Sequence, residues 1–169
     1  MASNTLIIGY GNKMRGDDGI GPYIAEKIEL SQWPSTDVWV MQQLQVELVE
    51  DIKGYKPIIF IDAALNARQL KINVIPGTRT QDDASGACAG NFTKQQSSST
   101  STHHLSPYAL WQLCEKLYQV RLDMYLVSIP ARQFDMTESI STETLAYADK
   151  AVEEIQKIVV SGASSFNNG

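Results

Sequence analysis

The segment from Gly9 to Gly21 forms the corner between an expected strand and an expected helix, and it constrains this chain more than any other feature. The apolar run Leu6–Ile8 precedes it, and a helical pattern from Pro22 to Ile28 follows it. Glycines at such a corner often let a phosphate approach the backbone. Here the adjacent carboxylates of Asp17 and Asp18 stand where a phosphate loop carries Lys and Ser or Thr, and the third glycine of a dinucleotide-binding pattern is missing. The corner therefore favours a cation over a phosphate.

Composition and charge indicate an ordinary globular domain that spans residues 1–169. The net charge of -5 argues against nucleic-acid binding. No apolar stretch approaches the ~18 residues of a membrane span, and the N-terminus lacks the pattern of a secretory signal. Cys88 and Cys114 lack metal-type spacing, which indicates free thiols in a reducing compartment. We expect a cytoplasmic monomer with neither a nucleic-acid nor a membrane partner.

Strand patterns alternate with helix patterns along the chain, which predicts an α/β fold. We expect a three-layer α/β/α sandwich around a mostly parallel twisted sheet. The expected strands are Thr5–Gly9, Asp37–Met41, Pro57–Asp62, Leu70–Ile75 and Met124–Ile129. The expected helices are Gly21–Leu30 with Tyr23 facing inward, Val46–Ile52, Tyr108–Tyr118 with Leu117 facing inward, and a last helix that begins at Ser141. The polar stretch 77–102 predicts a long mobile loop, and residues 161–169 predict a frayed tail.

Three acidic residues and one histidine are the candidates for chemistry. Asp17 and Asp18 follow the first strand, Asp62 ends the third, and ligands in such folds bind at the carboxyl ends of strands. The histidines of the chain, His103 and His104, precede a helix. Two carboxylates and one imidazole suit a divalent transition metal. Each residue also has a plainer interpretation, because Asp62 can cap a turn, one of the aspartates can cap the first helix, and each histidine can be an exposed polar residue.

The arrangement of these residues resembles the [NiFe]-hydrogenase maturation endopeptidases. The resemblance rests mainly on the motif Gly9-x-Gly-Asn followed by Gly16-Asp-Asp-Gly-x-Gly-Pro22, which is similar to the N-terminal signature of that family. A strand that ends in Asp62 and the sequence His103-His-Leu105 match the remaining landmarks in order and spacing. The resemblance covers residues 5 to about 160.

The resemblance implies a function. Members of this family remove a short C-terminal extension from the hydrogenase large-subunit precursor after nickel has been inserted. By resemblance, Asp18, Asp62 and His103, with His103 preferred over His104, form a site that senses nickel presented by the precursor and that carries catalysis. No organic cofactor is implied. A nickel-binding chaperone that holds the precursor without cutting it is the alternative.

Two segments depart from the family pattern. The stretch Met41–Leu48 replaces an Asp-Gly-Gly-Thr-like motif and resembles the subgroup that serves bidirectional, NAD(P)-linked hydrogenases. In that subgroup Gln43, Leu44 and Glu47 would border the substrate cleft, and we expect Asp17 there too. The second departure is Ser128-Ile-Pro-Ala, where relatives often have a Gly-x-x-Pro turn.

The mechanism has two versions at this stage. In one, nickel acts as the Lewis acid that activates water and polarises the peptide carbonyl. In the other, nickel only docks the precursor, and an unligated carboxylate, Asp17 or Asp18, is the general base.

Overall fold

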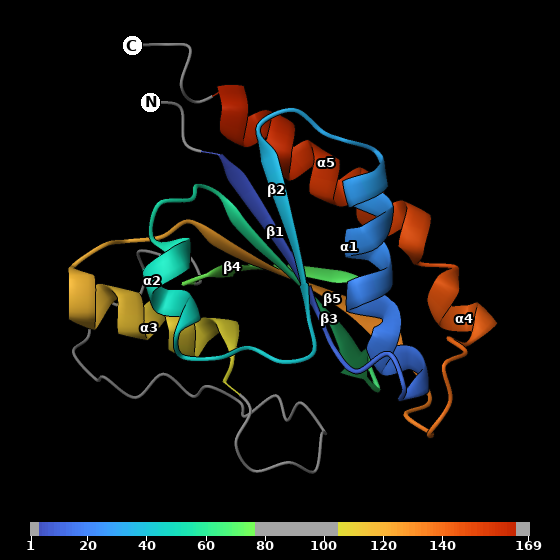
Figure 1. Ribbon diagram of the computed structural model, residues 1–169. Coiled ribbons are helices and arrows are strands. Elements are labelled where there is room, and N and C mark those ends of the chain that lie inside the picture. Colours follow the sequence, from blue (N-terminus) through green and yellow to red (C-terminus); the bar gives the residue numbers. More distant parts are fainter. Residues whose placement is uncertain (1–3, 77–104, 165–169) are drawn as a thin grey trace, which may run out of the picture.

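Five strands form one sheet in the order β2-β1-β3-β5-β4 (Figure 1). The structure is a computed structural model that describes residues 4–76 and 105–164. Four strands are parallel, and β4 runs antiparallel to β5 at one edge. The strands are β1 (Thr5–Tyr10), β2 (Thr36–Met41), β3 (Ile58–Leu65), β4 (Lys71–Ile75) and β5 (Met124–Ala131). The predicted mostly parallel α/β sheet is confirmed.

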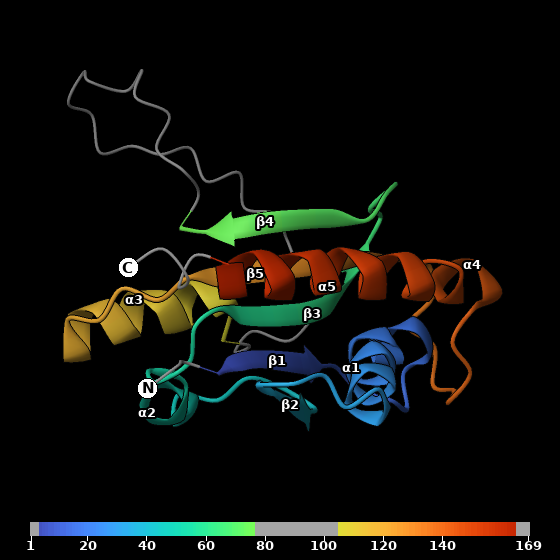
Figure 2. The ribbon, with the colours of Figure 1, turned by 90° about the horizontal axis from the view of Figure 1, so that it is seen from above.

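Helices cover both faces of this sheet (Figures 1 and 2). The helices are the 3-10 helix η1 (Gly16–Gly19), α1 (Ile20–Leu30), α2 (Leu48–Ile52), α3 (Pro107–Tyr118), α4 (Thr142–Leu145) and α5 (Ala148–Ser164). Apolar residues of α2 and α3 pack with one face, and those of α1 and α5 pack with the other. Each face therefore has its own apolar core.

The central strands are apolar at consecutive positions because both of their faces are covered. On β1, Leu6 and Ile8 belong to the core under α2 and α3, whereas Ile7 belongs to the core under α1 and α5. On β3, Phe60 and Ile61 divide between the two cores in the same way. All five side chains are fully buried.

Two glycines allow α1 to pack directly on the sheet. A Cβ on Gly9 would lie 2.3 Å from the carbonyl oxygen of Gly21 and 2.5 Å from the Cβ of Ala25. A Cβ on Gly21 would lie 2.5 Å from the carbonyl oxygen of Ile61 and 2.6 Å from that of Tyr10. The backbones of α1, β1 and β3 therefore approach more closely than any side chain permits.

Several expected element boundaries and two expected buried side chains are wrong. The strand expected to end at Asp62 continues to Leu65, because residues 62–65 still pair with β5. Tyr23 and Leu117, expected to face inward, are 40% and 62% exposed. Part of the expected frayed tail is helical, since α5 continues to Ser164. The expected loop 77–102 falls outside the described residues.

The expected last helix is two helices. A helix begins at this point, as expected, and Ser141 is the N-cap of α4, because its Oγ accepts a hydrogen bond from the amide of Thr144 at 3.3 Å. The first helix then closes on a tighter turn, in which the Tyr147 amide donates to the Thr144 carbonyl at 3.1 Å. The helical spacing of apolar residues continues from α4 into α5, so the sequence pattern did not indicate the break between the two helices.

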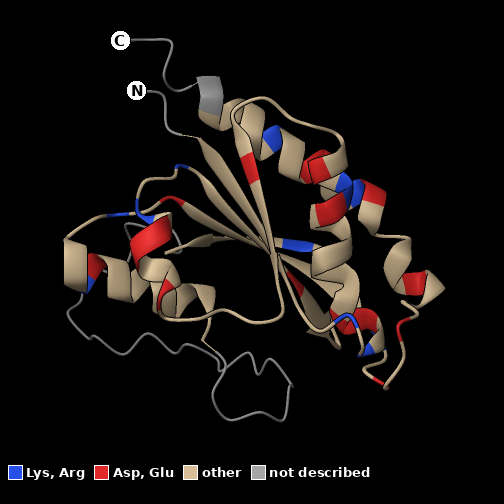
Figure 3. Ribbon diagram, in the orientation of Figure 1, with Lys and Arg blue, Asp and Glu red and all other residues tan. Residues whose placement is uncertain are grey.

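The helices of the described part are each too short or too polar to cross a lipid bilayer. In Figure 3, the Lys and Arg positions of the described residues are scattered among Asp and Glu positions along the ribbon and form no single stripe. The absence of a basic stripe agrees with the low isoelectric point of about 5.0.

Substitution of Gly21 by Ala tests the close approach of α1. We expect Gly21→Ala to lower the free energy of unfolding by about 3 kcal/mol, because the new methyl group meets backbone carbonyls that cannot move aside. Urea denaturation measures the loss. Gly54→Ala is the matched control, since no atom lies within 4 Å of a Cβ at Gly54. Equal stability of the two variants would contradict the packing argument.

Candidate functional site

Asp17 is fully buried and holds two distant loops together. Its Oδ2 accepts hydrogen bonds from the amides of Arg132 at 2.7 Å and Gln133 at 3.1 Å. Its Oδ1 accepts from the amide of Ser141 at 2.7 Å. The hydroxyls of Ser141 and Thr144 each lie 2.9 Å from Oδ2. Asp17 therefore joins the β1–α1 corner to the exit of β5 and to the start of α4.

This network corrects two predictions about Asp17. The residue does not line a substrate cleft, because its exposed fraction is 0% and both of its oxygens are occupied. It caps neither η1 nor α1, since neither helix has a side-chain cap. Burial alone would raise the pKa of Asp17, but the hydrogen bonds from Arg132, Ser141 and Gln133 outweigh burial and lower it. Asp17 is thus a buried structural anion.

Asp18 points the other way and is only partly buried. Its Oδ2 accepts a hydrogen bond from the amide of Asn12 at 2.8 Å. The side chain of Asn12 in turn accepts from the amide of Met14 at 2.9 Å. Gly11, at φ +145°, lets the loop close, because a Cβ there would lie 2.0 Å from the carbonyl oxygen of Asp18. The loop fixes one oxygen of Asp18 and leaves Oδ1 without a donor among the described residues.

Asp62 lies on β3 and is held by Tyr10, a residue that the sequence analysis missed. The Tyr10 hydroxyl donates a hydrogen bond to Asp62 Oδ2 at 2.9 Å. The Tyr10 ring packs edge-on against Phe60, with ring centroids 6.4 Å apart. The sequence positions could have indicated this pair, because Tyr10 ends the buried strand β1 and Asp62 lies on the neighbouring strand β3.

Asp18 and Asp62 lie close enough to affect each other and Tyr10 electrostatically. Burial, together with the negative charge of Asp18, raises the pKa of Asp62 to about 7, although the Tyr10 hydrogen bond opposes the rise. Burial also raises the pKa of Tyr10, and the charges of Asp62 and Asp18 add to that rise. The structure therefore brings both predicted carboxylates together at the carboxyl edge of the sheet.

The residues predicted to border a substrate cleft divide between surface and core. Gln43 and Glu47 are exposed. Leu44 is 5% exposed and packs in the core under α2 and α3, so the prediction that it lines a cleft is wrong. Gln43 lies in a hollow of about 480 Å³ that follows the end of β2. The hollow is lined by Met41, Gln42, Gln43, Gln45 and Leu48.

The third predicted ligand, His103, and its neighbour His104 fall outside the described residues. The described part holds no group of three or more His, Cys, Asp or Glu side chains able to bind a metal. Asp18 and Asp62 supply two oxygen donors, which fit a divalent cation only as part of a larger ligand set. A cation there would need ligands from elsewhere, such as a histidine or a bound protein.

Comparison with solved structures identifies the fold. The hydrogenase maturating endopeptidase HybD from E. coli superposes with a TM-score of 0.69 and 15% identity, covering 94% of this chain and 93% of that one. The [NiFe] hydrogenase maturation protease HycI from Thermococcus kodakarensis gives 0.64 and 21%, covering 94% and 93%. The hydrogenase 2 maturation peptidase from Thaumarchaeota archaeon SCGC_AB-539-E09 gives 0.63 and 19%, covering 94% and 99%.

No protein-family model and no curated protein sequence matches this chain. At 15% to 21% identity, the structural likeness establishes a shared fold over almost the whole length of each protein. The chain therefore has the fold of the hydrogenase maturation proteases.

The buried anion predicts a loss of stability in Asp17→Asn. We expect the free energy of unfolding to fall by about 3 kcal/mol at pH 7, because an amide oxygen is a weaker acceptor than a carboxylate and the amide NH₂ faces other donors. The lowered pKa of Asp17 stabilises the fold above the pKa of the unfolded chain, so the difference should shrink as the pH falls below ~4. Urea denaturation from pH 3.5 to 7 measures both effects.

Asp18→Asn is the matched control for that experiment, because it makes the same change one residue further on, where a single amide donates to the side chain. A loss as large as that of Asp17→Asn would show that the Asp17 network has no special weight.

The raised pKa of Asp62 predicts the opposite pH dependence. Below pH ~4 the Asp62 carboxyl of the wild type is protonated in both the folded and the unfolded protein. As the pH rises from there through about 7, the unfolded protein loses this proton more readily than the folded protein, so folding becomes less favourable. Asp62→Asn removes that cost and can keep the Tyr10 hydrogen bond. We expect the variant to be more stable than wild type by roughly 2 kcal/mol at pH 8, and equal to it near pH 4, in metal-free buffer. Wild-type stability at pH 8 that matches or exceeds the variant would refute the assignment.

Proposed function

We propose that this protein is an endopeptidase that cleaves the C-terminal extension from the nickel-loaded precursor of a [NiFe]-hydrogenase large subunit. One observation carries the proposal: Asp18 and Asp62 lie together with Tyr10 at the carboxyl edge of a sheet whose fold is that of hydrogenase maturation proteases. The family resemblance carried by the motif from Gly9 to Gly21 and by the strand that includes Asp62 implies a site with the same two carboxylates.

Nickel enters this proposal as cargo of the substrate. Asp18, Asp62 and His103 would contact it, and the cation would supply Lewis acidity to the peptide carbonyl or to water. Leu105, two residues after His103 in the sequence, packs against the apolar core that also contacts Tyr10. The start of α3 thus lies on the face of the sheet that carries the Tyr10–Phe60 pair.

The residues of the chain provide a reason for selectivity. Two neighbouring carboxylates repel each other, and a divalent cation relieves that repulsion. A nickel-free precursor brings no such relief, so it should bind more weakly. The Tyr10 hydroxyl holds Asp62 Oδ2, and the amide of Ala63 also donates to this carboxylate, so both groups fix its position for a ligand. Because Asp17 is fully hydrogen-bonded, Asp18 is the remaining candidate of the two for a general base.

The substrate subgroup is also part of the proposal. The stretch Met41–Leu48 resembles proteases that serve bidirectional, NAD(P)-linked hydrogenases, and its exposed members Gln43 and Glu47 lie where they can contact a precursor. We place the reaction in the cytoplasm, where a monomer would meet a precursor that has received its nickel.

Incubation with the precursor tests the function directly. The purified protein should shorten the nickel-loaded large-subunit precursor at its C-terminus and leave the nickel-free precursor intact, as seen by intact mass spectrometry. Asp18→Asn, Asp62→Asn and His103→Ala should each slow cleavage at least about a hundredfold, since each removes a group from the reacting site.

Asp123→Asn is the matched control, because this aspartate precedes β5 at the opposite edge of the sheet and pairs with Lys56. It should cleave like wild type. A stable complex with unchanged precursor mass would establish the nickel-binding chaperone instead. Normal cleavage by Asp62→Asn would exclude the three-residue site.

A further inference from the structure

Two hydrogen bonds fix which backbone groups of β2 face β1. The amide of Thr5 donates to the carbonyl of Ser35 at 3.0 Å, and the amide of Gly11 donates to the carbonyl of Met41 at 3.1 Å. Backbone groups alternate in direction along a strand of a parallel pair. The odd-numbered residues of β2 therefore bond to β1.

The even-numbered residues of β2, which are Thr36, Val38 and Val40, direct their N–H and C=O groups to the outer side. Among the strands of the described residues, none pairs with that side. Figure 2 shows β2 at the border of the sheet, with β1 as its neighbour on the inner side. Val40 is 38% exposed at this edge. An open row of backbone groups is a template for one more strand.

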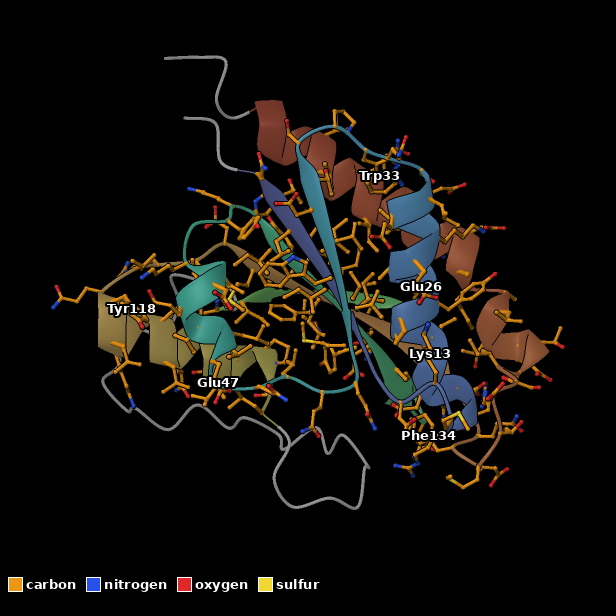
Figure 4. All side chains as sticks on the ribbon, viewed as in Figure 1. Lys13, Glu26, Trp33, Glu47, Tyr118 and Phe134 are labelled. Carbon is orange, nitrogen blue, oxygen red and sulfur yellow. The ribbon has the colours of Figure 1, made fainter. Side chains whose placement is uncertain are left out.

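Two hollows lie at the two ends of this edge. One, of about 300 Å³, flanks the first part of β2, and Gln32, Trp33 and Val38 are among its lining residues. The other is the hollow of about 480 Å³ that follows Met41. In Figure 4, Trp33 lies near the start of β2, and Glu47 lies beyond its end. A peptide on this edge would therefore find space for side chains at both ends.

We propose that β2 binds the C-terminal extension of the precursor as an added antiparallel strand. The proposal rests on the proposed function and names its substrate-binding surface. The reacting bond must lie near Asp18 and Asp62, at the carboxyl edge of the sheet. The extension then leads away from that edge, toward the amino end of β2, so it runs opposite to β2. Six residues of β2 span about 17 Å, which matches an extended peptide of five or six residues.

The chemistry of the larger hollow suits a peptide backbone. Gln42, Gln43 and Gln45 contribute amides, which both donate and accept hydrogen bonds, as a peptide group does. Strand addition takes its affinity from main-chain hydrogen bonds and its selectivity from pockets for alternate side chains. The edge would thus bind an extended segment with modest demands on its sequence.

The other edge of the sheet is a weaker choice. β4 lies beyond β5, on the side of β3 away from Tyr10. The two hollows are lined by residues of α1, β2, α2 and their connections, and none of their lining residues belongs to β4. β2 is therefore the edge strand nearer to the candidate site, because it pairs with β1, and Met41 of β2 lies opposite Tyr10.

Hydrogen exchange of the outer amides tests the proposal. We expect the amides of Val38 and Val40 to exchange rapidly in the free protein and at least about tenfold more slowly with nickel-loaded precursor bound. The Asp62→Asn background stops cleavage during the measurement. The amides of Ile72 and Val74 on β4, the other edge strand, are the internal control and should not change.

Val40→Pro is the second measurement, made in the wild-type background. Proline removes the outward N–H, and edge positions of this kind tolerate it. We expect the KM for nickel-loaded precursor to rise about tenfold, with a Tm close to that of wild type. An unchanged KM in a folded Val40→Pro protein overturns the proposal.

The remaining outcomes distinguish a failure of strand addition from a failure of the proposed endopeptidase function. Wild-type cleavage without protection of Val38 and Val40 in a complex shown to form overturns strand addition and leaves the endopeptidase intact. Protection of these amides in a dimer of the free protein assigns the edge to a second copy. Failure of wild type to bind or cleave any large-subunit precursor overturns the proposed function, and strand addition falls with it.

Discussion

The buried carboxylate of Asp17 is the interaction on which the rest of the site depends. A charged group without exposure is stable only when hydrogen bonds replace its water, and here three amides and two hydroxyls do so. Four of these five donors come from the segment that leaves β5 and from the cap of α4. The anion therefore fixes the position of η1 relative to β5, and with it the position of the next residue, Asp18.

Asp17 and Asp18 thus differ in their surroundings, and the close packing of the backbone determines which of the two is buried. Gly9 and Gly21 let α1 lie directly on β1 and β3, which places η1 over the carboxyl edge of the sheet. Asp17 then points inward to its donors, while Asp18 faces Tyr10 and Asp62. Tyr10, at the end of β1, packs its ring against Phe60 and donates a hydrogen bond from its hydroxyl to Asp62, both on β3. The fold thereby holds two carboxyl groups at the same edge of the sheet, and the proposed function uses this pair to contact a cation.

The open side of β2 extends this site along the sheet. Under the proposed function, the protein would have to hold a flexible segment of the precursor next to fixed side chains, and main-chain pairing with an edge strand would do so with little dependence on sequence. The glutamines after β2 line the hollow that follows the carboxyl end of this strand.

The sequence by itself determined the fold class and most of the elements, and its family resemblance predicted that Asp18 and Asp62 share one site. It could do so because buried parallel strands are apolar at every position and because strand ends collect at one edge. Tertiary structure decided the burial of Asp17, the partnership of Tyr10 with Asp62, the entry of Leu44 into the core, and the break between α4 and α5. Each of these depends on contacts between residues at least about twenty positions apart or on competition between hydrogen bonds. Local periodicity indicates which residues prefer burial. Which hydrogen-bond donors contact a buried carboxylate depends instead on how distant segments of the chain pack together.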